Sequence, residues 1–85
     1  MIECKIDRDG NKRWLKNGKR HKEDGPAIEW QNGDKSWYID GLRHRDDGPA
    51  IVHANGYTCW FVNGKEYSHD EFVMLQFSKG IITNG

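Results

Sequence analysis

The chain is poor in cysteine, carries no net charge and has no long apolar run, and each absence excludes a class of protein. No stretch of about 18 apolar residues occurs, so the sequence predicts no membrane span. The first residues lack the apolar region of a secretory signal, so we expect a cytoplasmic protein. The two cysteines, Cys4 and Cys59, lie far apart and outside any C-x-x-C pair. They predict two free, partly buried thiols rather than a disulfide or a zinc site.

Motifs of catalysis and metal binding are also missing. The chain has no G-x-x-x-x-G-K-S/T loop, no G-x-S-x-G and no H-x-x-x-H. His21 precedes Asp24 by three residues, as His44 precedes Asp47, and each aspartate could orient its histidine as a general base. Because an active site is seldom copied with its scaffold, we instead interpret each His and Asp as tying its own turn. The sequence thus predicts a protein that is not an enzyme and needs no metal or cofactor.

What the chain does have is an internal repeat within a single domain of 85 residues. A step of 23 residues from Trp14 aligns WLKNGKRHKEDGPAIEWQNGDKS with WYIDGLRHRDDGPAIVHANGYTC. A third, partial copy begins at Trp60, and a half-unit containing Asp9-Gly10 precedes the first copy. We therefore assign residues 9–67 to the repeats.

Each unit contains two β-hairpin signals. The six Asn-Gly or Asp-Gly steps are Asp9-Gly10, Asn17-Gly18, Asn32-Gly33, Asp40-Gly41, Asn55-Gly56 and Asn63-Gly64. These pairs tolerate the positive φ of a type I′ turn, which matches the twist of paired strands. The Asp-Gly-Pro steps mark where one unit passes to the next, because proline donates no ladder hydrogen bond. The sequence predicts a mostly β fold, an antiparallel meander of β-hairpin repeats with one C-terminal helix.

Alternation along the strands predicts two faces, each with large side chains. Trp14, Trp37 and Trp60 point to one face, and the residues that follow them, Leu15, Tyr38 and Phe61, point to the other. We interpret the tryptophans as structural and expect Trp37, in the central unit, to belong to the core. One face should pack on the C-terminal segment and leave the other free for a partner.

The segment after the repeats predicts a capping helix over residues 68–79, followed by a tail at 80–85. Ser68 fits an N-cap with Glu71 three residues later, the pattern of a capping box. Gly80 is a suitable C-terminal stop. A repeat array needs a terminal cap to cover its last apolar surface.

Charge is unevenly distributed along the chain. Residues 1–22 carry eight Lys or Arg against three acids, a local +5, and residues 23–85 carry five against ten, a local −5. The candidate partner or RNA-binding residues are Lys12, Arg13, Lys16, Lys19, Arg20, Lys22, Arg43 and Arg45. Basic side chains neutralise phosphates while exposed aromatic rings stack on bases. A net charge of zero weighs against a free-standing nucleic-acid-binding protein.

The unit W-[LY]-x-[ND]-G-x-R-H-[KR]-[ED]-D-G-P-A-I resembles the D-G-P-A repeats of small tailed-phage proteins and is similar to the MORN-type repeat, itself a β-hairpin unit. Within that group, the chain length, the two and a half repeats and the helical tail resemble the toxin-inhibitory factors of T4-like phages. That resemblance implies a protein of the host cytoplasm that antagonises a host toxin, a ToxN-type endoribonuclease of type III toxin–antitoxin defence, with RNA as a further component. A nucleic-acid-binding module and a structural repeat without a dedicated ligand stay open as alternatives.

Overall fold

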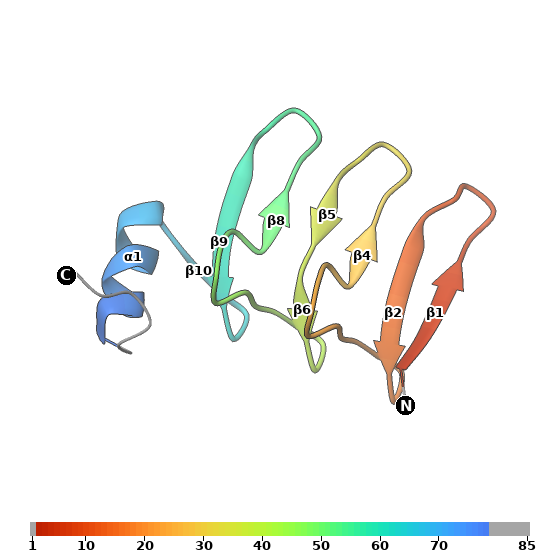
Figure 1. Cartoon of the computed structure of the whole chain (residues 1–85), viewed down its shortest axis with the longest axis horizontal. Coiled ribbons are helices and arrows are strands. Elements are labelled where there is room, and N and C mark those ends of the chain that lie inside the picture. Colours follow the sequence, from red (N-terminus) through yellow and green to blue (C-terminus); the bar gives the residue numbers. More distant parts are fainter. Residues whose placement is uncertain (1, 79–85) are drawn as a thin grey trace.

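The computed structural model describes residues 2–78 of the chain, as a flat row of hairpins that ends in a helix (Figure 1). The strands are β1 (Ile2–Ile6), β2 (Lys12–Lys16), β3 (Lys19–Arg20), β4 (Ile28–Glu29), β5 (Lys35–Ser36), β6 (Tyr38–Ile39), β7 (Leu42–Arg43), β8 (Ile51–Val52), β9 (Thr58–Val62) and β10 (Lys65–Tyr67). The helix is α1 (His69–Ser78). The predicted stop at Gly80 and the tail at 80–85 lie outside the described residues.

One antiparallel sheet runs through all the units in the order β1-β2-β4-β5-β8-β9-β10, with β3 paired to β2. Strands β6 and β7 form a separate two-stranded hairpin. The molecule measures 46 × 31 × 22 Å, the proportions of an elongated single layer. The predicted mostly β meander of hairpin repeats with one C-terminal helix is therefore confirmed.

The six predicted turns are present, but they are of two kinds. Asn17, Asp40 and Asn63 have φ of 52°, 49° and 51°, and the glycine after each also has a positive φ, as a type I′ turn requires. At the other three turns only the glycine is left-handed. In one of these, Gly33 N–H donates to Trp30 O at 3.0 Å and Trp30 N–H to Asp34 O at 2.9 Å, closing a three-residue loop. The prediction of type I′ geometry therefore holds for the lower row of turns in Figure 1 and not for the upper row.

The alanine of the D-G-P-A motif lies where adjacent hairpins of the sheet meet. Ala27 and Ala50 are both fully buried. Ala27 N–H donates to Ser36 O at 2.8 Å, and Ala27 O accepts from Trp14 N–H at 2.8 Å. Ala50 O accepts at 2.7 Å from the N–H of Trp37, which lies in the preceding hairpin. A side chain larger than a methyl group would force the units apart here, because packed interiors leave no spare volume.

The prediction that Trp37 belongs to the core is wrong. The indole is half-buried, whereas its neighbour Tyr38 is only 7% exposed and clusters with Ala27 and Ile28. The reason is the single-layer architecture, since among the described residues no second sheet or helix lies over β5 and β6, the strands on either side of Trp37 (Figure 1). Trp14 is half-buried as well, and Trp60 is half-buried although His69 and Phe72 of the helix contact its ring.

The histidines join units, which corrects the prediction that each ties its own turn. His21 Nδ1 accepts the Asp40 N–H at 3.0 Å, and His44 Nδ1 accepts the Asn63 N–H at 3.0 Å, in each case across to the next unit. The carboxylates near their Nε2 atoms are those of Glu23 and Asp46, at 3.5 and 3.2 Å. Glu23 and Asp46 thus take the place of the predicted partners Asp24 and Asp47, and Asp47 instead accepts from Arg45 Nε at 2.8 Å.

A second set of hydrogen bonds joins the units at their upper turns. Asn11 Oδ1 accepts the Gln31 N–H at 2.8 Å, and Asp34 Oδ1 accepts the Ala54 N–H at 2.7 Å. The bond from Ala54, followed by that from Asn32, lowers the pKa of the Asp34 carboxyl. Hydrogen bonds thus join successive units at both of their hairpin ends.

Helix α1 begins at the predicted capping box. Ser68 N–H donates to Glu71 Oε1 at 2.8 Å and Glu71 N–H donates to Ser68 Oγ at 3.1 Å. The bond from the Ser68 N–H, followed by the Ser68 side chain, lowers the pKa of the Glu71 carboxyl. Phe72 is buried with its ring 6.4 Å from that of Trp60. The buried Gln76 donates its side-chain amide to Asp46 O. The helix therefore packs at the end of the array, against β9 and β10, and not along one face of the whole sheet as expected (Figure 1).

The cysteines are both free, as predicted, but only Cys59 is partly buried. Cys4 is exposed because it lies on the outermost strand, β1. Within residues 2–78, no helix has the length and apolar character needed to cross a membrane.

Candidate interaction surface

Arginines alternate with aromatic rings along one face of the sheet. The strand register sets Leu15 opposite Arg20 and Tyr38 opposite Arg43. The same register in the third unit sets Phe61 opposite Glu66. We call this the arginine–aromatic face, made of Arg13, Leu15, Arg20, Tyr38, Arg43 and Phe61.

The guanidinium groups on this face lie close to the rings of neighbouring units. Arg20 Cζ is 5.5 Å from the centroid of Tyr38. Arg43 Cζ lies between two rings, 5.8 Å from Tyr38 and 5.4 Å from Phe61. Such cation–π contacts hold the guanidinium plane and leave its N–H edges directed to solvent.

These arginines are exposed and carry positive charge that the described chain does not neutralise by contact. Among residues 2–78, no carboxylate lies within 4.0 Å of the guanidinium groups of Arg13, Arg20 or Arg43. Beside them, a depression of about 420 Å³ is lined by Arg13, Leu15, Gly18, Lys19, Arg20 and Gly41. The face can therefore donate several charge-assisted hydrogen bonds to an anionic partner.

On the opposite face of the sheet, the positively charged side chains contact rings and acceptors of the chain itself. We call it the tryptophan face, made of Trp14, Lys22, Trp37, Arg45 and Trp60. Lys22 Nζ lies 4.0 Å above the Trp14 ring, and Arg45 Cζ lies 3.9 Å above the Trp37 ring. Arg45 also binds Asp47 through Nε at 2.8 Å and donates to Pro49 O at 3.0 Å. Both cations thus hold this face together.

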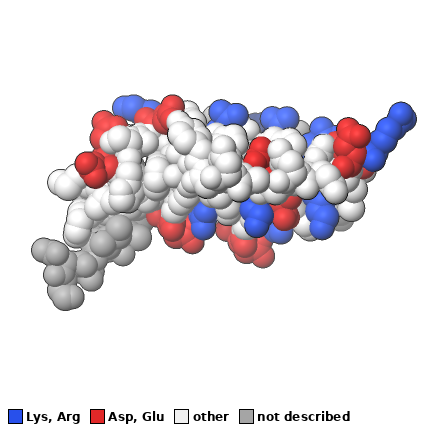
Figure 2. Space-filling view, turned by 90° about the horizontal axis from the view of Figure 1, so that it is seen from above, with Lys and Arg blue, Asp and Glu red and all other residues white. Residues whose placement is uncertain are grey.

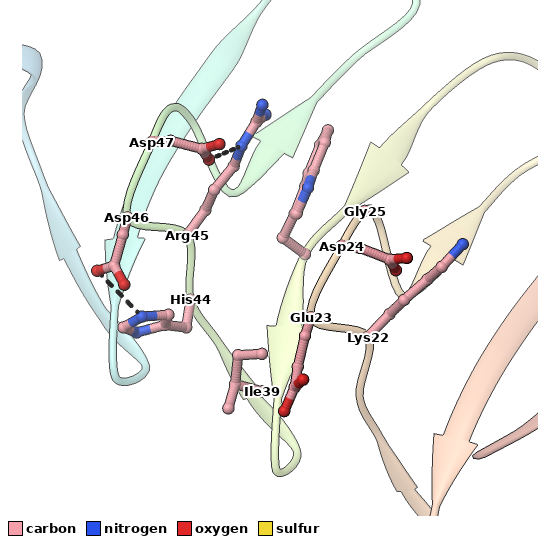
Figure 3. Close-up of a pocket in the computed structure, with 10 residues that line it drawn as sticks. Lys22, Glu23, Asp24, Gly25, Ile39, His44, Arg45, Asp46 and Asp47 are labelled. Carbon is pink, nitrogen blue, oxygen red and sulfur yellow. Dashed lines mark hydrogen bonds and ion pairs between the residues drawn. The ribbon is translucent and has the colours of Figure 1, made fainter.

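A groove on the tryptophan face lies between the two Asp-Gly-Pro segments (Figure 3). It has a volume of about 750 Å³, with Glu23 and Asp24 on one wall and Asp46 and Asp47 on the other. His44 donates toward Asp46, which assigns its proton to Nε2 because Nδ1 already accepts a bond. No cluster of three or more His, Cys, Asp or Glu side chains within residues 2–78 could hold a metal ion.

The predicted basic cluster does not form a single patch. Alternation along β2 separates Arg13 from Lys12 and Lys16, which lie on the Trp14 side. Arg43 lies on the arginine–aromatic face, and Arg45, two residues later, stacks on Trp37. Figure 2 shows Lys and Arg side chains along both long sides of the molecule, with Asp and Glu among them.

Reasoning from the sequence missed the roles of Tyr38 and Phe61 as platforms for arginine. The signal was present in the repeat, because a two-residue turn at Asp40-Gly41 sets Tyr38 opposite Arg43. Pairing these positions across the turn in each unit would have identified the face.

No protein-family model, curated protein or solved structure matches the chain. The relation to D-G-P-A repeat proteins is accordingly a resemblance of its motif.

Proposed function

We propose that the chain is a non-enzymatic binding protein whose arginine–aromatic face docks on a host toxin of the endoribonuclease class, with toxin-bound RNA reinforcing the complex. The main observation behind this proposal is that Arg20 and Arg43 are exposed and make cation–π contacts with rings. Neither has a carboxylate partner among the described residues. The choice of toxin comes from the resemblance of the repeat, and the choice of face comes from these contacts.

The geometry supports binding because the arginines are already held in place. A free arginine loses side-chain entropy when a partner immobilises it, whereas one stacked on a ring has lost part of that freedom before binding. Its planar fork matches carboxylate and phosphate groups with two parallel hydrogen bonds. Tyrosine and arginine are also the side chains that most often dominate the energy of protein interfaces.

The charge of the whole chain favours a protein partner over RNA alone. Net charge is zero, and Glu66 ends the arginine–aromatic face at the third unit. A protein that binds RNA without help usually carries a broad basic surface. We therefore assign RNA a secondary role, in which its phosphates meet Arg20 and Arg43 at the edge of a protein contact.

The test is binding to a purified type III endoribonuclease toxin, with and without its RNA. Arg20→Glu together with Arg43→Glu should weaken binding by about tenfold or more, because each reversal removes a charge-assisted hydrogen bond and sets like charges against an anionic partner. The matched control is Lys16→Glu with Lys65→Glu, two reversals on the other face, which should bind like the unmodified chain. Equal losses in both variants, or no binding of the unmodified chain, would contradict the proposal.

A separate arm measures RNA alone in a salt titration. A steep fall of affinity with salt and no dependence on toxin would instead establish a nucleic-acid-binding module.

A further inference from the structure

The outer edge of β1 is the open end of the sheet. β1 pairs with β2 on one side, and within residues 2–78 no strand pairs with its other side. All five of its residues are exposed, including Ile2 at 44% and Ile6 at 63%. The opposite end of the sheet is different, because α1 packs on β9 and β10. An open edge with exposed apolar side chains is a template for pairing with another strand.

The backbone of this edge presents its hydrogen-bonding groups outward at three residues. Asp7 N–H donates to Asn11 O at 3.0 Å, so the bonds between β1 and β2 fall at odd-numbered residues of β1. Trp14, the partner of Cys4, instead donates its N–H to Ala27 O on the far side of β2. The N–H and C=O groups of Ile2, Cys4 and Ile6 therefore point away from β2.

The sequence of β1, Ile-Glu-Cys-Lys-Ile, complements itself when one copy is reversed against another. An antiparallel pairing centred on Cys4 sets Ile2 opposite Ile6 of the second copy and Glu3 opposite its Lys5. Each pair occurs twice, so the edge gains two apolar pairs and two opposite-charge pairs, both of which stabilise cross-strand contacts. We propose that this chain forms a two-fold dimer by pairing the outer edges of β1 in this register.

This pairing of two β1 edges gives a closed dimer. A two-fold contact uses the same patch on both copies, so each β1 edge is occupied by the other copy. The two sheets join into one, with the arginine–aromatic faces of both copies on the same side, since residues opposite one another share a face. Such a short contact belongs among the small, transient interfaces, so the dimer should depend on concentration. This dimer does not depend on the proposed toxin partner.

A charge exchange tests the register. Lys5→Glu sets like charges opposite one another twice, and Glu3→Lys does the same, so each should raise the dimer dissociation constant by about tenfold or more. The double variant with both changes restores both opposite-charge pairs and should dimerise like the unmodified chain. Glu66→Lys, an exposed change in β10, is the control and should have no effect. Sedimentation over a concentration series measures the constants, and unchanged melting temperatures show that the variants fold.

Cys4 provides an independent readout. Hydrogen-bonded antiparallel pairs have Cα atoms about 5.5 Å apart, within the range that a disulfide spans. Diamide, which takes up the two hydrogens as two thiols form one disulfide, should trap a covalent dimer in the unmodified chain and in Cys59→Ser. Cys4→Ser should give none. A chain that is monomeric at every concentration, a double variant that fails to restore pairing, or a crosslink through Cys59 would overturn the proposal.

Discussion

The two faces of the sheet carry the same kinds of side chain and use them differently. On the tryptophan face, Arg45 stacks on Trp37, pairs with Asp47 and donates to a backbone carbonyl. On the arginine–aromatic face, Arg43 contacts two rings but no carboxylate within residues 2–78. A cation whose contacts are completed within the chain serves stability, and one held on rings alone keeps its hydrogen-bond donors for a partner.

The largest expected difference between the faces is in the free energy of unfolding. Tyr38→Ala should cost about 3–5 kcal/mol, because it empties a buried site in a thin core. Trp37→Ala should cost clearly less, since the indole is half-buried. Urea denaturation of the two variants measures both values. If Trp37→Ala proved the more damaging, the assignment of the core to Tyr38 would be wrong.

A smaller difference should separate the two arginines. Arg45→Ala should lower the free energy of unfolding by about 1–2 kcal/mol, through loss of a cation–π contact and two hydrogen bonds. Arg43→Ala should cost about 0.5–1 kcal/mol, because its exposed cation–π contacts are weaker. Thermal denaturation compares them directly. The reverse order would mean that the arginine–aromatic face is structural and the tryptophan face is the one available to a partner.

Acid should lower the stability of the sheet as a whole and not that of one face, because Asp34 joins the upper turns of two successive units. Its hydrogen bond from Ala54 lowers its pKa, so the unfolded chain binds more protons than the folded chain in the acid range. The stability that this lowered pKa contributes is fully present above the ordinary aspartate pKa. It is lost as the pH falls through the lower pKa of the folded chain. Asp34→Asn should reduce this acid sensitivity, as Asn11 already makes the equivalent bond through an amide oxygen. Melting temperatures across the acid range, compared with those of the unmodified chain, measure the effect.

The smallest effect is expected from the thiols, one on each side of the sheet. Cys4→Ser combined with Cys59→Ser should change the free energy of unfolding by about 1 kcal/mol or less and leave toxin binding unchanged. Calorimetric titration in a reducing buffer checks the binding. A loss of binding there would assign a thiol to the partner contact.

Much of the local structure could be predicted from the sequence. The Asn-Gly and Asp-Gly steps located all six turns, and Ser68 with Glu71 located the start of α1. These signals are reliable because the interacting groups lie within a few residues of one another, so their geometry is set by local backbone preferences. The difference between the two turn types was missed, since Asn-Gly and Asp-Gly suit a left-handed glycine in both.

The sequence by itself thus determined the repeat, the hairpins, the turns and the capping box, all of which depend on neighbours close along the chain. Only the tertiary structure decided that His21 and His44 bind the next unit, that Trp37 is half-buried, and that the basic residues divide between two faces. Each of these depends on how successive units stack, across separations of about one repeat. The stacking is set by the buried alanines and by the single layer of the sheet, which leaves the tryptophan side without a second layer to cover it.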